Sequence, residues 1–171
     1  MKPLKNWLKR GPLFEFLQRI RYRISPFPRR SKNSYITNTK VFPIQDNVVL
    51  ETSYLGPEYG PGPVASVYIY DQEVMRLDCL GGDAGHYHVN LTQSLFYPRG
   101  QTARLYFPNG SVEQHIEMAA FQLRRNLDYA RRQNYRQRIR AVKLDQDKLD
   151  QVANEMTNEL LKLYRETTAT S

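Results

Sequence analysis

Residues 48–107 alternate short runs of β-branched and aromatic residues with turn-forming residues, and this pattern predicts several short strands. The clearest hairpin joins residues 64–70 to residues 73–79 through a tight turn at Asp71 and Gln72. We therefore expect a mostly antiparallel sheet of four or five short strands. The other predicted strands are residues 48–54, 86–90 and 104–107.

The last third of the chain carries apolar residues at helical spacing. Ser111 and Gln114 form a capping-box pattern, which predicts the start of a helix. Apolar residues then recur every three or four positions, which predicts a first helix from residue 112 into the 130s and a second over roughly residues 145–166. We expect Leu123 and Met156 to lie in one core. Strands followed by helices predict an α+β domain, with both C-terminal helices on one face of the sheet.

Residues 1–40 have a different composition from the rest of the chain. The apolar residues of 13–24 fall on one side of a helix and the arginines fall largely on the other side. Pro26, Pro28 and the polar residues that follow then interrupt the pattern. This predicts a basic amphipathic helical arm and linker over residues 1–40, and a single α+β domain over residues 41–171. A chain of 171 residues is long enough for one ordinary domain.

The net charge of +8 is concentrated in two blocks. Residues 1–32 contain ten basic residues and one acidic residue, and residues 113–143 contain eight basic and three acidic residues. Such blocks attract nucleic-acid phosphates without regard to base sequence, and they also suit an acidic protein partner. The residues expected to bind nucleic acid or a partner are Arg19, Arg21, Arg23, Arg29, Arg30, Arg124, Arg125, Arg131, Arg132 and Arg136.

Three further roles for the basic arm stay open at this point. Its apolar stripe can dock on the domain, residues 1–24 can lie on an anionic membrane surface, or the arm can act as an organellar presequence. The first two fit a cytoplasmic protein and the third an organellar one. No apolar stretch approaches the ~20 residues that a membrane-spanning helix needs. The single cysteine excludes a disulfide framework within the chain and a zinc site built from several thiolates.

One cluster of residues carries candidate chemistry. His86 and His88 share a face of their predicted strand, and pairing with the preceding strand would place them beside Asp78 and Arg76, or opposite Cys79 in the alternative register. Two imidazoles and a carboxylate can hold Zn²⁺ or another divalent ion, and His115 is a third candidate imidazole ligand. Without a metal, the same groups can perform acid–base catalysis, because imidazole titrates near neutral pH. The alternative is that all three histidines are structural.

The charge pattern favours a small intracellular accessory or regulatory protein, not an enzyme, which binds nucleic acid, another polyanion or a protein partner without a cofactor. The alternative is a metal-dependent or His-dependent hydrolase or nuclease with catalytic residues His86, His88 and Asp78 and a divalent metal ion as its cofactor. The two hypotheses differ in one respect: an enzyme needs these three side chains to converge at a place that substrate can reach. The sequence leaves the oligomeric state and the identity of the partner open.

Overall fold

The computed structural model describes residues 36–90, 104–134 and 136–169. The amphipathic helix predicted for the arm therefore lies outside the described residues, as do five of the candidate binding residues. These are Arg19, Arg21, Arg23, Arg29 and Arg30.

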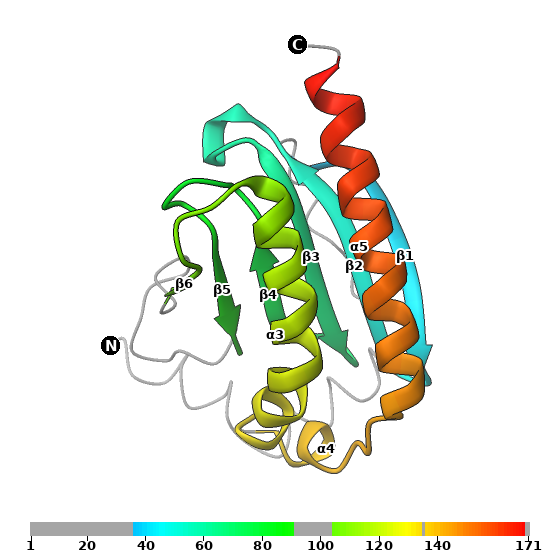
Figure 1. Ribbon diagram of the computed structural model, residues 1–171. Helices are drawn as coiled ribbons and strands as arrows, with labels where there is room; N and C mark the ends of the chain where they lie inside the picture. The colour runs from blue at the N-terminus through cyan, green and yellow to red at the C-terminus, as the bar shows by residue number, and fades with distance from the viewer. Residues whose placement is uncertain (1–35, 91–103, 135, 170–171) are drawn as a thin grey trace, which may run out of the picture.

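Within the described residues, six antiparallel strands form one sheet, and each strand pairs with its neighbours along the chain (Figure 1). This confirms the predicted α+β class, with one strand more than the four or five expected. The best predicted hairpin is present, but its turn lies at Tyr70 and Asp71 instead of Asp71 and Gln72, because Gln72 pairs with Ile69 and Tyr70 adopts a φ of 57°. The strands are β1 (Ile36–Gln45), β2 (Val48–Leu55), β3 (Gly62–Ile69), β4 (Gln72–Asp78), β5 (His86–Val89) and β6 (Leu105–Tyr106), with a short 3-10 helix η1 (Pro57–Tyr59) between β2 and β3.

The additional strand is β1, which begins within the range assigned to the arm and linker. Only Phe42 and Ile44 are buried among its ten residues. Its pairing with β2 is interrupted at two places, and Asn38 adopts a positive φ of 52°. An irregular and exposed edge strand has no regular alternation of apolar and polar residues, so the sequence pattern did not predict it. The sheet starts at Ile36.

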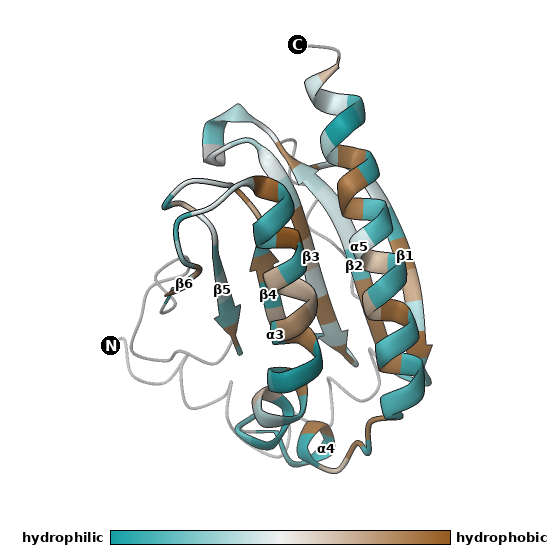
Figure 2. Cartoon of the chain, in the orientation of Figure 1, coloured by the Kyte–Doolittle hydropathy of each residue, from teal (hydrophilic) through white to brown (hydrophobic). Residues whose placement is uncertain are grey.

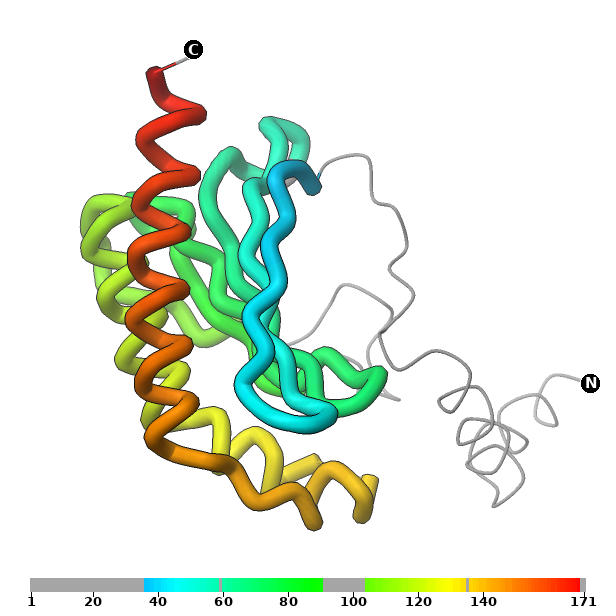
Figure 3. The backbone as a smooth tube through the Cα atoms, turned by 90° about the vertical axis from the view of Figure 1, so that its right-hand side faces the viewer, coloured from blue at the N-terminus to red at the C-terminus, as the bar shows by residue number. Residues whose placement is uncertain are grey.

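Two long helices, α3 (Val112–Arg132) and α5 (Gln146–Thr168), run antiparallel to each other, and the short α4 (Gln137–Arg140) lies between them in the chain. The predicted capping box starts α3: the Gln114 N–H donates to Ser111 Oγ at 3.2 Å, and the Ser111 N–H donates to Gln114 Oε1 at 2.8 Å. Figure 3 shows both helices on the same side of the sheet. Among the described helices, none has an apolar stretch long enough to cross a bilayer.

The core lies between these helices and one face of the sheet. Val67 of β3 pairs with Leu50 on one side and with Met75 on the other, and all three side chains are fully buried. Leu123 of α3 and Met156 of α5 belong to the same buried cluster, as predicted. Figure 2 shows the hydrophobic residues concentrated on the central strands and in stripes along both helices. The opposite face of the sheet is therefore available for polar residues.

Candidate metal centre

The β4–β5 hairpin carries the candidate residues on the face of the sheet that points away from α3 and α5. Asp78 pairs with His86, and Arg76 pairs with His88, which is the predicted register. Leu77 lies between the two β4 residues and points into the core. Since alternate residues of a strand point to opposite faces, the register places two imidazoles and one carboxylate together.

The three side chains converge on one oxygen atom. Asp78 Oδ2 is 3.3 Å from His86 Nε2 and 3.4 Å from His88 Nε2. One ligand atom from each residue lies within 4.8 Å of the others. The imidazole rings meet edge to face with their centroids 4.7 Å apart. All three residues are buried, with exposed fractions of 4% for Asp78, 6% for His86 and 7% for His88.

The backbone fixes which nitrogen of His86 faces the carboxylate. His86 Nδ1 lies 2.7 Å from the carbonyl oxygen of Ala84. A carbonyl oxygen only accepts hydrogen bonds, so the proton of the neutral ring lies on Nδ1. Nε2 then directs a lone pair at Asp78 Oδ2. Two acceptors face each other at this point, and they need a proton or a metal ion between them.

Burial disfavours the first of these alternatives, a proton on Nε2 of His86. It lowers the pKa of His86 below the ordinary value of a histidine, and the charges of His88 and Arg104 act in the same direction. The Ala84 carbonyl and the Asp78 carboxylate act against this shift. The lowered pKa means that His86 is mainly neutral at neutral pH, with its Nε2 lone pair free to bind a cation.

The distance of the carboxylate oxygen from each imidazole nitrogen fits a tetrahedral ion, and the three ligand atoms all lie within 4.8 Å of one another. Zinc–nitrogen and zinc–oxygen bonds of about 2.0–2.2 Å place neighbouring ligand atoms about 3.3–3.5 Å apart in a tetrahedron. The two contacts of Asp78 Oδ2 with Nε2 of His86 and His88, at 3.3 and 3.4 Å, have this length. The hydrogen bond from Nδ1 of His86 to a carbonyl is the outer-shell contact that commonly orients a metal-binding histidine. Iron and manganese also accept this set of two histidines and one carboxylate.

His115, the third candidate imidazole, does not join this group. Its Nδ1 accepts a hydrogen bond from the Gly81 N–H at 3.0 Å, and its Nε2 lies 3.0 Å from the carbonyl oxygen of Pro108. Both ring nitrogens are therefore used, and the residue is fully buried. His115 ties the loop between β4 and β5 to the start of α3. Cys79 is also fully buried, and burial raises its pKa well above the ordinary value of a thiol, so it stays protonated and unreactive.

Two residues beside the cluster were not predicted from the sequence. Tyr106 of β6 pairs with His86, and their ring centroids are 5.7 Å apart. Arg104, two positions earlier, lies near enough for its charge to act on His86. The sequence of residues 104–107 predicted a strand but not its neighbour, because fourteen residues separate β5 from this segment. Tyr106 is 60% exposed, so the register partner of the buried His86 lies at the surface.

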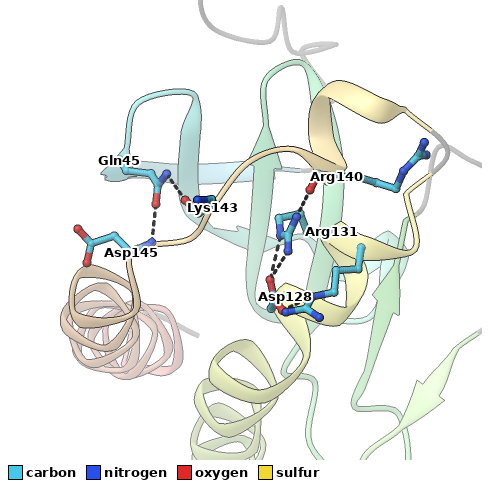
Figure 4. Close-up of polar contacts among 7 residues, drawn as sticks. Gln45, Asp128, Arg131, Arg140, Lys143 and Asp145 are labelled. Atoms are coloured by element: carbon cyan, nitrogen blue, oxygen red, sulfur yellow. Dashed lines mark hydrogen bonds and ion pairs between the residues drawn. The ribbon is translucent and has the colours of Figure 1, made fainter.

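The second basic block has mainly internal partners. Arg131 donates to Asp128 and to the carbonyl oxygen of Arg140, and Gln45 bonds to the backbone on both sides of the turn into α5 (Figure 4). Arg136 donates to Asp71 at 3.2 Å. Arg131 and Arg136 are both buried, so they hold the turn after α3 in place.

The other candidate arginines of this block lie on the surface of α3. Arg124 reaches across to α5, where it contacts Asn154 and Asp150, and Arg132 pairs with Asp128 within α3. Arg125 is exposed and makes no side-chain hydrogen bond or ion pair with the described residues. The five candidates therefore do not form one free basic surface.

Comparison of the chain with known protein families, with curated protein sequences and with solved structures gave no match.

Proposed function

We propose that the protein binds a divalent transition metal ion through Asp78, His86 and His88, and that the ion supports a hydrolytic reaction. The observation that carries this proposal is the convergence of Nε2 of both histidines on one oxygen of a buried carboxylate, at 3.3 and 3.4 Å. An isolated buried charge is unfavourable, and the Asp78 carboxylate is 4% exposed, with the two imidazole nitrogens and the charge of Arg76 beside it. A cation between the three atoms compensates the carboxylate charge and satisfies the Nε2 lone pair of His86.

The number of protein ligands favours catalysis over a purely structural role. Structural zinc sites have four protein ligands, whereas catalytic sites have three and leave one position for water or substrate. A metal ion in such a site lowers the pKa of a bound water molecule toward neutrality, so that hydroxide is available as a nucleophile. The chain's own contribution is to hold the three ligands in a fixed arrangement, with the Ala84 carbonyl orienting His86. This proposal moves the hydrolase hypothesis ahead of the metal-free binding protein.

Zinc titration of the full chain tests the site directly. We expect about one equivalent of Zn²⁺ to bind, and a concentration of 100 times Kd to stabilise the fold by about 2.7 kcal/mol. The variant His86→Ala/His88→Ala should lose more than about 100-fold in affinity, because even an outer-shell change costs about 10–100-fold. Affinity should fall as the pH is lowered, since the ligands bind the ion in their deprotonated forms. Isothermal titration calorimetry and elemental analysis measure these quantities.

A matched pair of carboxamide variants separates the site from general charge effects. Asp78→Asn removes the buried carboxylate, whereas Asp83→Asn removes an exposed carboxylate from the adjoining loop. We expect the first to abolish the bound equivalent and the second to leave it unchanged. Equal zinc binding by all of these variants would contradict the proposal, and Fe²⁺ and Mn²⁺ are titrated alongside to find the preferred ion.

Polyanion binding through basic surfaces is the second candidate function. The +9 charge of residues 1–32 supports it, as does an exposed stripe on α3 in which Phe121, Arg125 and Tyr129 follow each other at intervals of four residues. Arginine between two exposed aromatic rings suits contact with phosphate and an unpaired base. This function does not require a metal ion.

Neutralising the arm tests that second function. In the full chain, Arg19→Gln/Arg21→Gln/Arg23→Gln should elute from heparin at lower salt than the unchanged protein, because fewer phosphate or sulfate contacts reduce the release of counterions. The matched control is Lys40→Gln/Lys148→Gln/Lys162→Gln, which removes the same charge from exposed positions of the domain. Equal shifts for the two variants would show that net charge alone determines retention.

A further inference from the structure

Arg104 and Tyr106 extend the proposed metal site to the edge of the sheet. Tyr106 is the register partner of His86 across β5 and β6, and Arg104 shares its face because side chains alternate along the strand. Both residues are exposed, in contrast to the buried ligands beside them. Arg104 makes no hydrogen bond or ion pair with the described residues. A positive charge with no such partner and an exposed ring therefore flank the ligands.

We infer that this edge binds a phosphate ester of an unpaired nucleotide, with the phosphate between the metal ion and Arg104 and the base against Tyr106. The inference rests on the proposed metal site and names its substrate class. It concerns the face of the sheet opposite the helices, so it is separate from the α3 stripe of Phe121, Arg125 and Tyr129. The charge at this edge, the placement of the cations and the exposed ring of Tyr106 each support the inference.

The positive charge of the proposed ion and of Arg104 favours an anionic ligand. The double positive charge of a divalent ion exceeds the single negative charge of Asp78, and both histidines are neutral when they bind a metal. Arg104 adds a further positive charge at the rim. The guanidinium of Arg76, the register partner of His88, is already bonded to Glu73 at 2.9 Å, and Ser66 donates to the same carboxylate oxygen at 2.7 Å. Arg104 is therefore the residue positioned to meet an incoming anion.

The placement of Arg104 beside the proposed ion favours phosphate over other anions. A guanidinium can donate two parallel hydrogen bonds to a phosphate, and a metal ion can bind another oxygen of the same group. The proposed ion lies on β4 and β5, and Arg104 directly precedes β6, the strand that pairs with β5, so one tetrahedral phosphate group can contact both cations. A phosphodiester carries one such group between each pair of nucleosides, so a strand of nucleic acid presents it repeatedly.

The exposed ring of Tyr106 favours contact with an unpaired base. Tyr106 is 60% exposed and its ring is tilted by 44° from that of His86, so its stacking surface is not covered by the histidine. Bases of single strands stack on such rings with little sequence preference, whereas a base inside a duplex has no free face. The neighbouring Tyr87 stacks on Phe107, with ring centroids 5.8 Å apart, and belongs to the other side of the sheet. Tyr106 is thus the ring available beside the metal site.

The test measures the binding of inorganic phosphate and of a fluorescent single-stranded RNA hexamer to the zinc-loaded full chain. We expect Arg104→Gln to weaken both ligands by about tenfold, and Tyr106→Leu to weaken the hexamer by about tenfold with little effect on phosphate. Both variants should bind zinc as the unchanged protein does. The matched control is Arg165→Gln, an exposed arginine of α5 on the opposite side of the sheet, which should change neither affinity. A DNA hexamer of the same sequence shows whether the site distinguishes the two sugars.

The outcomes separate this inference from the metal site. Zinc binding with unchanged phosphate and hexamer affinity in both variants would overturn the inference and leave the metal site standing. Loss of zinc binding in His86→Ala/His88→Ala, together with loss of phosphate binding, would support both proposals. Equal hexamer binding by the zinc-loaded and the metal-free protein would also overturn the inference, because the phosphate would then not contact the ion. Tighter binding of a duplex than of the single strand would exclude stacking on Tyr106.

Discussion

Leu123→Asp should unfold the domain. Leu123 of α3 is fully buried in the core that α3, α5 and the sheet form, in the same cluster as Met156. An aspartate at this position brings a charge into an apolar core with no basic partner among the described core residues, at a cost of several kcal/mol. The net stability of a domain of this size is about 5–15 kcal/mol, so the variant should lose most or all of it. Circular dichroism with urea or thermal denaturation measures the loss.

The same helix provides the matched control. Phe121, two positions earlier, is 59% exposed, so Phe121→Asp introduces the same carboxylate into solvent. We expect a change within about 0.5 kcal/mol, as for other surface substitutions. Met156→Asp should behave like Leu123→Asp, because both side chains lie in one core. A wild-type melting temperature for either core variant would contradict the packing of α3 and α5 on the sheet.

Gly85→Ala should destabilise the fold and disturb the metal site together. A Cβ atom at residue 85 would lie 1.9 Å from Nδ1 and 2.3 Å from Cε1 of the fully buried His115. The imidazole would have to move, and its hydrogen bonds to Gly81 and Pro108 would be lost with it. Overpacking usually costs about 1–3 kcal/mol, and we expect the upper end of this range. Since residue 85 adjoins His86, zinc affinity should also fall, by about tenfold.

A double-mutant cycle shows whether the clash causes this effect. His115→Ala removes the ring that the new methyl group would meet, so Gly85→Ala/His115→Ala should be less destabilised than the sum of the single variants, by at least about 1 kcal/mol. Gly82→Ala is the control in the same loop. No atom lies within 4 Å of its Cβ position, and only its φ of 60° should cost about 1 kcal/mol. Additive effects in the cycle would contradict the proposed clash.

Much of the fold follows from local patterns in the sequence. The hairpin of β3 and β4, the capping box at Ser111 and the stripes that bury Leu123 and Met156 are all local, and the structure contains each of them. The pairing of Asp78 with His86 is one of the two registers that alternation and the short loop allowed, and the structure contains this one instead of the register with Cys79. Local patterns predict such features because the interacting residues are neighbours in the strand, the helix or the turn.

The features that the sequence did not reveal depend on contacts between distant residues. Strand β1 carries little alternation, because it lies at an irregular edge. Residues 91–103 lie between His86 and Tyr106 in the sequence, and they give no register from which the pairing of these two residues could be predicted. Arg136 reaches Asp71 over sixty-five positions, so its use inside the fold was not visible from the charge pattern, which counts arginines without their partners. The same reasoning applies to His115, whose two bonds fix it as structural.

The order of the strands also has a consequence for how the protein folds. Because every strand pairs with the next one along the chain, the sheet needs few contacts between distant residues. The three proposed ligands lie within the eleven residues 78–88, and a loop of seven residues separates Asp78 from His86. Closing so short a loop costs little entropy, so this hairpin can form early and independently of α5. During synthesis on the ribosome, the chain would then present a complete donor set before its C-terminal helix has emerged, and an ion bound at that stage would stabilise the nascent sheet.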